Sequence, residues 1–368
     1  MEKKLVSLPL YSKLAQIIVA LLAFFYILYI GKGIIVPFVF STILAILLNP
    51  VVNFMTKRGM NRVLAIITVL ILAIVLVAGI GSLIGSQVAM FSESVPQLKE
   101  KFTLLFSNLR GWVSTSFNVD QGKIDNWVNN VKTEGVNSLA GVAGQTLGAI
   151  SGGLIVAVLI PIYVFMILFY KTLLLGFIAR LFKNDQHSVV NEVLNETKSL
   201  IQSYLIGLLI EAALVATLNS IGLLVIGVQY AILLGVLGAL LNIIPYIGGV
   251  IAIAMPMLIA FATKSPISAL WVLIVYSVIQ FIDNNIIVPR IVASKVKING
   301  IISIIVVLFG GELWGVAGMF LSIPLTAIIK VIFDRMQGLE AFGYLLGDNM
   351  EDENTLHIIK KHPKKRNL

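Results

Sequence analysis

The chain has 368 residues, of which 58% are hydrophobic and 12% charged, and it contains no cysteine. Its mean hydropathy is +0.98. Because a soluble domain carries about 25% charged residues, this composition excludes a soluble globular protein and indicates a polytopic α-helical membrane protein. The net charge of +9 does not indicate a nucleic-acid partner, because Lys and Arg cluster between apolar stretches, where they set membrane orientation.

A helix that crosses a bilayer needs about 20 mostly apolar residues. Such stretches predict five unbroken spans, at about 14–30, 34–54, 63–91, 147–170 and 200–228, and a further span at about 267–288. Basic residues follow the second span at Lys57 and Arg58 and the fourth span at Lys171 and Arg180. By the positive-inside rule, these loops and both chain termini are expected in the cytoplasm.

The longest polar region, residues 92–146, separates the third and fourth spans and is expected outside the membrane. Apolar residues recur in it at helical spacing, first from Val95 to Val113 and again from Ile124 to Val131, which predicts amphipathic helices. The chain then divides into N-terminal spans (1–91), this external region (92–146), span four with a cytoplasmic linker (147–199), a transport core (200–335) and a cytoplasmic tail (336–368).

Two apolar stretches in the transport core are interrupted. Tyr230–Phe261 is broken by the sequence Asn242–Gly249, and Ile301–Phe333 is broken by Gly310–Gly315. Unpaired backbone is costly in lipid, so such breaks are tolerated only against protein or a water-filled cavity. Paired, interrupted segments point to the substrate site of a transporter.

Loop charge favours a particular path for the two broken segments. Arg290, Lys295 and Lys297 fall in the cytoplasm only if the first broken segment leaves the membrane on the side where it entered. We therefore predict an all-α polytopic membrane protein with about six full spans and two re-entrant helical hairpins of opposite orientation. The fifth span and the first hairpin would then mirror the span at 267–288 and the second hairpin, which predicts an inverted repeat. Chance similarity between apolar segments is the alternative interpretation.

Two carboxylates in the transport core are candidate site residues, Glu211 for binding a coupling ion together with Asp283, and Glu312 for shaping the central site. Glu211 stands inside the fifth span, where a charge is costly and usually faces a cavity or a partner. Its alternative role is a protonated side chain hydrogen-bonded between helices. Glu312 lies at the turn of the second hairpin, where it could line the site or serve only as part of a re-entrant cap.

Polar residues also mark the first break and the following span. The break contributes Asn242, Pro245, Gly248 and Gly249, whose helix ends leave free backbone groups for a cation or a polar solute. A packed helix kink is the alternative. The span contributes the cluster Gln280, Asp283, Asn284 and Asn285. It could replace the hydration shell of an ion, or form a helix-end hydrogen-bond network.

Motifs for enzymatic chemistry are missing from the sequence. There is no Gly-x-x-x-x-Gly-Lys-Ser/Thr motif for ATP, and no nucleophile with a nearby His lies in the spans. His187, His357 and His362 all lie in polar segments. We therefore expect neither an enzyme nor a cofactor or resident metal ion.

Three motifs carry a resemblance to a known family: Asn242–Gly249 (NIIPYIGG), Phe281–Arg290 (FIDNNIIVPR) and Gly315–Pro324 (GVAGMFLSIP). Together with the long polar region after the third span, they resemble the autoinducer-2 exporter family of transporters, up to about Gly347. The resemblance implies a secondary transporter of the bacterial inner membrane. Members are linked to export of the quorum signal autoinducer-2 or to exchange of sodium or lithium for protons. It also implies a homo-oligomer, with a pentamer expected.

The expected function is export of a small polar solute by alternating access, in which the two hairpins move against the first spans. A sodium or lithium/proton antiporter is the first alternative, with monovalent cations and protons as its ligands. Two further alternatives remain. The protein could be a channel, since re-entrant hairpins also build pores, or a membrane scaffold, since its polar regions could bind partners.

Overall fold

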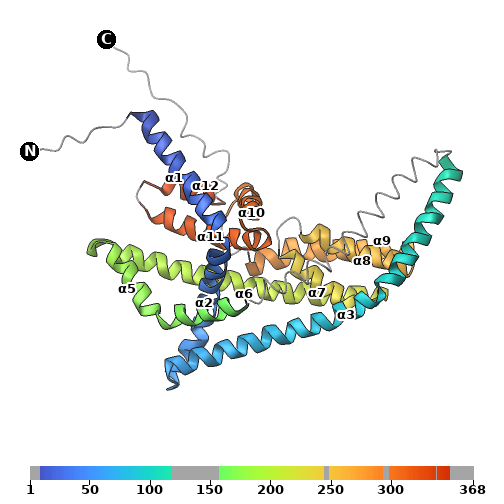
Figure 1. Cartoon of the computed structure of the whole chain (residues 1–368), viewed down its shortest axis with the longest axis horizontal. Coiled ribbons are helices and arrows are strands. Elements are labelled where there is room, and N and C mark those ends of the chain that lie inside the picture. The colour runs from blue at the N-terminus through green and yellow to red at the C-terminus, as the bar shows by residue number, and fades with distance from the viewer. Residues whose placement is uncertain (1–8, 118–156, 244–247, 293–297, 337, 349–368) are drawn as a thin grey trace, which may run out of the picture.

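The computed structural model describes residues 9–117, 157–243, 248–292, 298–336 and 338–348. Over these ranges the chain is almost wholly helical, with one isolated β-bridge between Ile298 and Gly347. Six helices in the described ranges are long and apolar enough to cross a membrane. The prediction of an all-α polytopic membrane protein is confirmed, and Figure 1 shows the arrangement of the helices.

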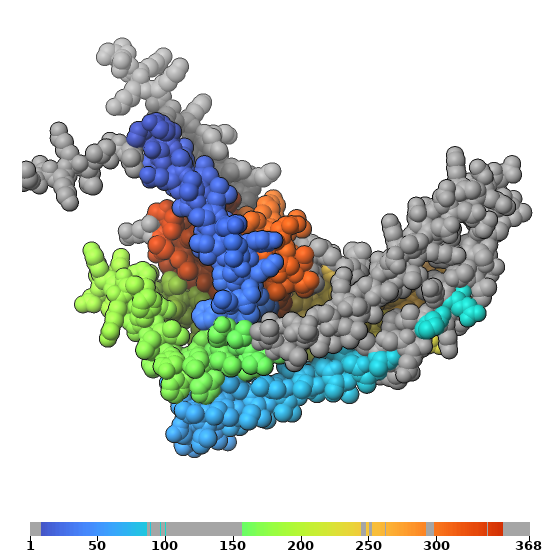
Figure 2. Space-filling model, in the orientation of Figure 1, coloured from blue at the N-terminus to red at the C-terminus, as the bar shows by residue number. Residues whose placement is uncertain are grey.

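The first two helices match the first two predicted spans. Helix α1 covers Leu10–Ile30 and α2 covers Lys32–Lys57. The described side chains of α1 are largely exposed, and Figure 2 shows the helix standing out from the rest of the molecule. Its apolar surface is what a helix surrounded by lipid requires.

Helix α3 is much longer than the predicted third span. It runs without interruption over Arg62–Phe117, 56 residues, so it is about 84 Å long at about 1.5 Å per residue. The first predicted amphipathic helix of the 92–146 region is therefore a continuation of the span. The helix changes direction toward its end, in the part that contains Pro96 (Figure 1). The second amphipathic stretch, 124–131, lies outside the described residues.

The fourth span and the linker after it also differ from the expectation. A helix at Ala157–Phe169 is followed, after a bend of 66°, by α5 at Lys171–Leu181. After the short 3-10 helix η1 at Asn184–Gln186, helix α6 runs from His187 to Ile226. The polar stretch before Ser199, which was expected to form part of a cytoplasmic linker, thus belongs to the same helix as the fifth span. It continues the turns of the fifth span, because no Pro or Gly separates the two.

Both predicted breaks separate pairs of helices. The first pair is α7 at Ala231–Asn242 and α8 at Gly248–Thr263. Helix α9 at Pro266–Ile282 follows, extended by the π-helix η2 at Asp283–Val292. The second pair is α10 at Gly300–Trp314 and α11 at Val316–Arg335, and the short helix α12 at Glu340–Leu346 comes last.

The α7–α8 pair returns to the place where it starts. Helix α6 ends at Gly227, which has a φ of 71° and a backbone conformation that favours glycine. The ammonium of Lys264, just beyond α8, donates a 2.7 Å hydrogen bond to the carbonyl of Ile226. The end of α8 therefore lies beside the end of α6, and α7–α8 form a helical hairpin with its open base there.

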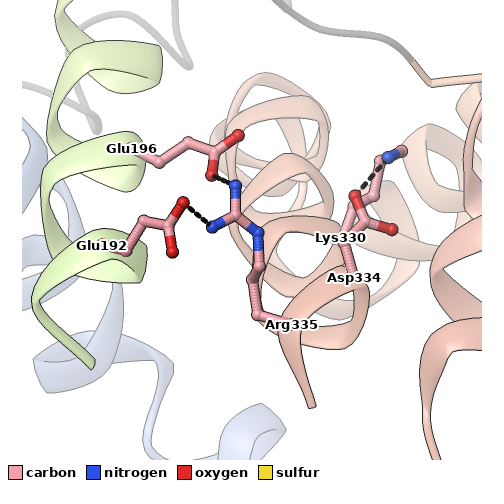
Figure 3. Close-up of polar contacts among 5 residues, drawn as sticks. All are labelled: Glu192, Glu196, Lys330, Asp334 and Arg335. Atoms are coloured by element: carbon pink, nitrogen blue, oxygen red, sulfur yellow. Dashed lines mark hydrogen bonds and ion pairs between the residues drawn. The ribbon is translucent and has the colours of Figure 1, made fainter. Parts of the chain in front are cut away.

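The open base of the α10–α11 pair lies at the other end of α6. Figure 3 shows the guanidinium of Arg335, the last residue of α11, between the carboxylates of Glu192 and Glu196 in the first turns of α6. At the start of α10, the amide of Asn299 donates a 2.7 Å hydrogen bond to the carbonyl of Leu345 in α12. The two hairpins are thus anchored at opposite ends of α6, as the predicted opposite orientation requires. Their depth in a bilayer and the inverted repeat stay predictions.

The closed tips of both hairpins pack on one apolar cluster. Ile243, which follows α7, and Trp314, which ends α10, pack on the same apolar cluster around Tyr204 and Leu208 of α6. The indole N–H of Trp314 also donates a 3.0 Å hydrogen bond to the carbonyl of Leu28 in α1. The middle of α6 is therefore where both hairpins converge.

Candidate functional site

A polar cluster lies where the tip of the first hairpin meets the junction of α9 and η2. Asp283, at this junction, is 1% exposed. The side-chain amide of Asn242, the last residue of α7, donates a 2.7 Å hydrogen bond to Oδ2 of Asp283. Asn242 ends its helix where the chain must turn, and Asp283 stands where the α-helix widens to a π-helix. Such bulges often occur at functional sites.

Gln280 links this pair to the next turn of the helix. Its amide nitrogen lies 3.4 Å from Oδ1 of Asn242 and 3.3 Å from Oδ1 of Asn284. The spacing of Gln280, Asp283 and Asn284 places them on one side of the helix, as the sequence predicted. The cluster thus joins two segments about 40 residues apart through amide and carboxylate groups.

Gly249, in the first turn of α8, allows this close approach. A Cβ at this position would lie 3.1 Å from Oε1 of Gln280 and 3.5 Å from Oδ1 of Asn242. At Gly248 a Cβ would lie 1.8 Å from the carbonyl oxygen of Leu241. Gly248 is therefore required for the reversal from α7 to α8, whereas Gly249 keeps side-chain atoms out of the polar cluster.

Glu211 supplies a second carboxylate from the neighbouring helix. It is 7% exposed, and α6 packs directly against η2. Glu211 lies close enough to Asp283 for the two charges to interact, and also to Tyr204. Two carboxylates that repel each other in an apolar interior favour binding of a proton or a cation near them.

Two buried oxygens near the cluster lack a hydrogen-bond partner in the described part of the chain: Oδ1 of Asp283 and Oδ1 of Asn219. Buried polar atoms are normally satisfied, so each is available to a ligand or to water. Asn219 lies two turns after Glu211 in α6. Its amide nitrogen and the hydroxyl of Tyr276 both face Gly238 of α7, where a Cβ would lie 3.4 Å and 3.1 Å from them.

Sequence reasoning missed Asn219 and Tyr276. Both carried a signal, because Asn219 is an amide surrounded by apolar residues in the second half of its span and Tyr276 precedes Gln280 by one helical turn. A Tyr in a membrane helix is common, however, and only the fold brings its hydroxyl to α7.

The structure does not bring every predicted site residue to the cluster. Asn285 is exposed, and its amide donates to the carbonyl of Phe281 in its own helix. Glu312 is exposed near the end of α10, and no hydrogen bond or ion pair within the described ranges joins it to the cluster. Pro245 lies outside the described residues.

The assembled side chains can bind a small polar ligand or a hard cation through oxygen atoms. Among the described residues, no group of three or more His, Cys, Asp or Glu side chains is arranged to hold a metal ion. A polar site at a helix break, enclosed by apolar spans, is the arrangement found in secondary transporters. Fold and site together therefore place the chain in the class of polytopic membrane transport proteins.

Comparison with known proteins agrees. The family model described as "AI-2E family transporter" matches residues 18–338, and the chain belongs to this family. It is 28% identical over 312 residues to "Putative transport protein YrrI" of Bacillus subtilis (strain 168), covering 82% of this chain and 86% of the relative. It is 26% identical over 326 residues to "AI-2 transport protein TqsA" of Escherichia coli (strain K12), covering 86% and 90%.

Proposed function

We propose that this protein is a secondary transporter that exports a small polar solute, such as autoinducer-2, by alternating access. The observation that carries the proposal is the cluster of the part-buried Asn242 and Gln280 with the buried Asp283 at the tip of a helical hairpin, where one Asp283 oxygen has no partner among the described residues. A buried carboxylate is retained inside a membrane protein where it binds a ligand or an ion. The similarity to a relative named an AI-2 transport protein supports the choice of solute.

The two hairpins provide the moving parts in this proposal. Their bases are anchored at opposite ends of α6, and their tips pack on the same apolar cluster near its middle. Withdrawal of one tip would open the cluster toward one side of the membrane, while the other tip keeps the opposite side closed. Asn242 and Gly249 belong to the first hairpin, whereas Asp283 and Glu211 belong to the helices around it. Movement of that hairpin would therefore take apart and rebuild the site.

Exchange of sodium or lithium for protons is the second candidate. The proximity of Glu211 and Asp283 favours it, because two neighbouring buried carboxylates can bind either a cation or protons. Both candidates use the same cluster, and a solute exporter driven by an ion gradient would use both features. We further propose a homo-oligomer in the bacterial inner membrane with both termini in the cytoplasm.

Transport by the purified protein in proteoliposomes tests the proposal. Uptake or release of the solute, and of sodium and lithium, is measured under imposed proton and sodium gradients for the wild type, Asp283→Asn and Glu211→Gln. We expect Asp283→Asn to lower the transport rate at least tenfold, and Glu211→Gln to change its pH dependence.

The matched control is Glu340→Gln, which neutralises an exposed acid in α12 and should transport like the wild type. Solute flux without cation exchange would select the exporter, and gradient-driven cation exchange without solute flux would select the antiporter. Wild-type rates and pH profiles in both carboxylate variants would remove the cluster from the mechanism.

A further inference from the structure

A cavity lies far along the chain from the transport cluster, at the corner where α2 gives way to α3. Figure 1 shows the turn between these two helices. The volume of the cavity is about 380 Å³, and the start of α5 closes one side. This size lies in the range of ligand sites, about 300–1,000 Å³. The lining residues are Val52, Asn53, Thr56, Met60, Arg62, Lys171 and Thr172.

Two half-buried cations face this cavity. Arg62 is anchored by a 2.6 Å hydrogen bond from Nη2 to the carbonyl of Leu168. Lys171 is anchored by a 3.2 Å hydrogen bond from Nζ to Oδ1 of Asn49. Each contact uses one donor, so the remaining N–H groups, which have no other partner among the described residues, can bind a ligand. The contacts hold both cations at the cavity instead of letting them extend into water.

The positive charge in this place is not neutralised by the described part of the chain. Arg62 and Lys171 act on each other electrostatically, and the exposed Lys198 adds to the field at Lys171. No carboxylate within the described ranges forms an ion pair with Arg62 or Lys171. Holding like charges together costs free energy, and an anion between them would remove that cost.

The N-terminal ends of α3 and α5 add to the uncompensated positive charge at the cavity. Arg62 is the first residue of α3 and Lys171 is the first residue of α5, and neither helix has an acidic residue in its first turn. A helix N-terminus carries a partial positive charge, so a cation is unfavourable there and an anion is favourable. The cation at the start of each helix therefore destabilises that helix, and a bound anion would offset this effect.

We propose that this cavity binds a phosphate-bearing anion. The guanidinium of Arg62 can hold two phosphate oxygens and the ammonium of Lys171 a third. The hydroxyl of Thr172 can donate to the same group. The cavity lies beside the loop predicted to be cytoplasmic, where basic pockets between helices bind anionic lipid headgroups. A phospholipid and free phosphate share this chemistry, and the test separates them.

Thermal unfolding of the full-length protein in detergent, followed by tryptophan fluorescence, measures binding, because a ligand bound to the folded state raises the apparent Tm. One arm compares micelles containing phosphatidylglycerol or phosphatidylcholine at equal molar ratio. A second arm compares inorganic phosphate with chloride at equal ionic strength. We expect the anionic lipid or phosphate to raise the apparent Tm by about 2 °C or more.

Variants assign any shift to the cavity. Arg62→Gln/Lys171→Gln should abolish it, whereas Arg180→Gln, which removes an exposed cation from the last turn of α5, should retain it. Thr172→Glu brings a carboxylate to the first turn of α5. It should raise the apparent Tm without added anion and suppress the response to it. Lys171→Gln alone provides the test if the double variant does not fold.

A shift with phosphatidylglycerol alone assigns the site to a lipid headgroup, and a shift with inorganic phosphate assigns it to a soluble phosphate compound. The proposal is overturned if neither anion raises the apparent Tm, or if the cavity variants and Arg180→Gln respond alike. No residue of the transport cluster is changed in these experiments, so their outcome is independent of the proposed transport function.

Discussion

Asp283 is the residue on which the proposed transport site depends most directly. Its side chain is nearly inaccessible, and within the described residues Asn242 bonds to only one of its oxygens. The Asn242 amide therefore supports a buried acid and belongs to the tip of the first hairpin at the same time. In the proposed mechanism, a ligand at the other Asp283 oxygen would bind beside Asn242, which would couple ligand binding to the position of the hairpin.

Removal of the Asn242 amide should destabilise the protein through Asp283. In Asn242→Ala the buried carboxyl loses its hydrogen-bond donor, and we expect a loss of about 1–3 kcal/mol. Asn242→Ala/Asp283→Asn should recover part of this loss, because no charge is then left buried. Thermal unfolding of the four proteins of the cycle measures the coupling. A loss of stability in the double variant equal to the sum of the losses in the two single variants would show that the two side chains do not support each other.

Gly318 is the position in the second hairpin with the least room. Its Cβ would lie 1.9 Å from the carbonyl oxygen of Gly310, so α10 and α11 approach each other backbone to backbone. Gly318→Ala should force them apart and lower the apparent Tm and the yield of folded protein. Gly33→Ala is the matched control in α2, since nothing lies within 4 Å of its Cβ. A Gly318→Ala protein as stable as the control would contradict this packing.

The sequence predicted much of this residue-scale picture. Asn242, Gly249, Gln280, Asp283 and Asn284 do meet, because helical spacing and the helix break placed them correctly along the chain. Glu312 was indistinguishable from them in sequence, being another polar residue at a break. Whether such a residue faces the cluster depends on how α10 rotates against its neighbours, and local spacing does not determine that rotation.

At the scale of helices, the breaks were easier to predict than the ends. Gly315, with a φ of 65°, separates α10 from α11, as its sequence context indicated. The predicted end of α3 and the predicted start of α6 were wrong, because hydropathy marks where a helix leaves lipid, not where its hydrogen bonding stops. The polar residues before Ser199 continue α6 because neither Gly nor Pro interrupts them, whereas α3 continues through Pro96.

The path of the first hairpin can be tested by labelling, because the chain has no cysteine of its own. Gln229 and Pro266 are exposed and flank α7–α8. Single cysteines at these positions should both react with a membrane-impermeant reagent from outside, since Lys264 bonds to Ile226. Arg58→Cys should react only from the cytoplasm. Labelling of Gln229→Cys and Pro266→Cys from opposite sides would show that the segment crosses the membrane once.

For the whole molecule, α6 is the organising element. Its 40 residues extend about 60 Å, twice the hydrocarbon thickness of about 30 Å, so one end projects well beyond the lipid. Class and family could be inferred from composition and three motifs. The sharing of one helix by both hairpins could not, because it depends on contacts between segments more than 100 residues apart, such as Glu196 with Arg335.

The two attachments of the hairpins to α6 differ in chemistry. The fork of Arg335 with Glu192 and Glu196 is a partly exposed ion pair, which dissolved salt weakens. At the other end, the attachment includes a backbone carbonyl and a left-handed glycine turn. The protein would then have one attachment that weakens as the surrounding ionic strength rises and one that resists this change. A rise in ionic strength would release the base of the second hairpin before that of the first.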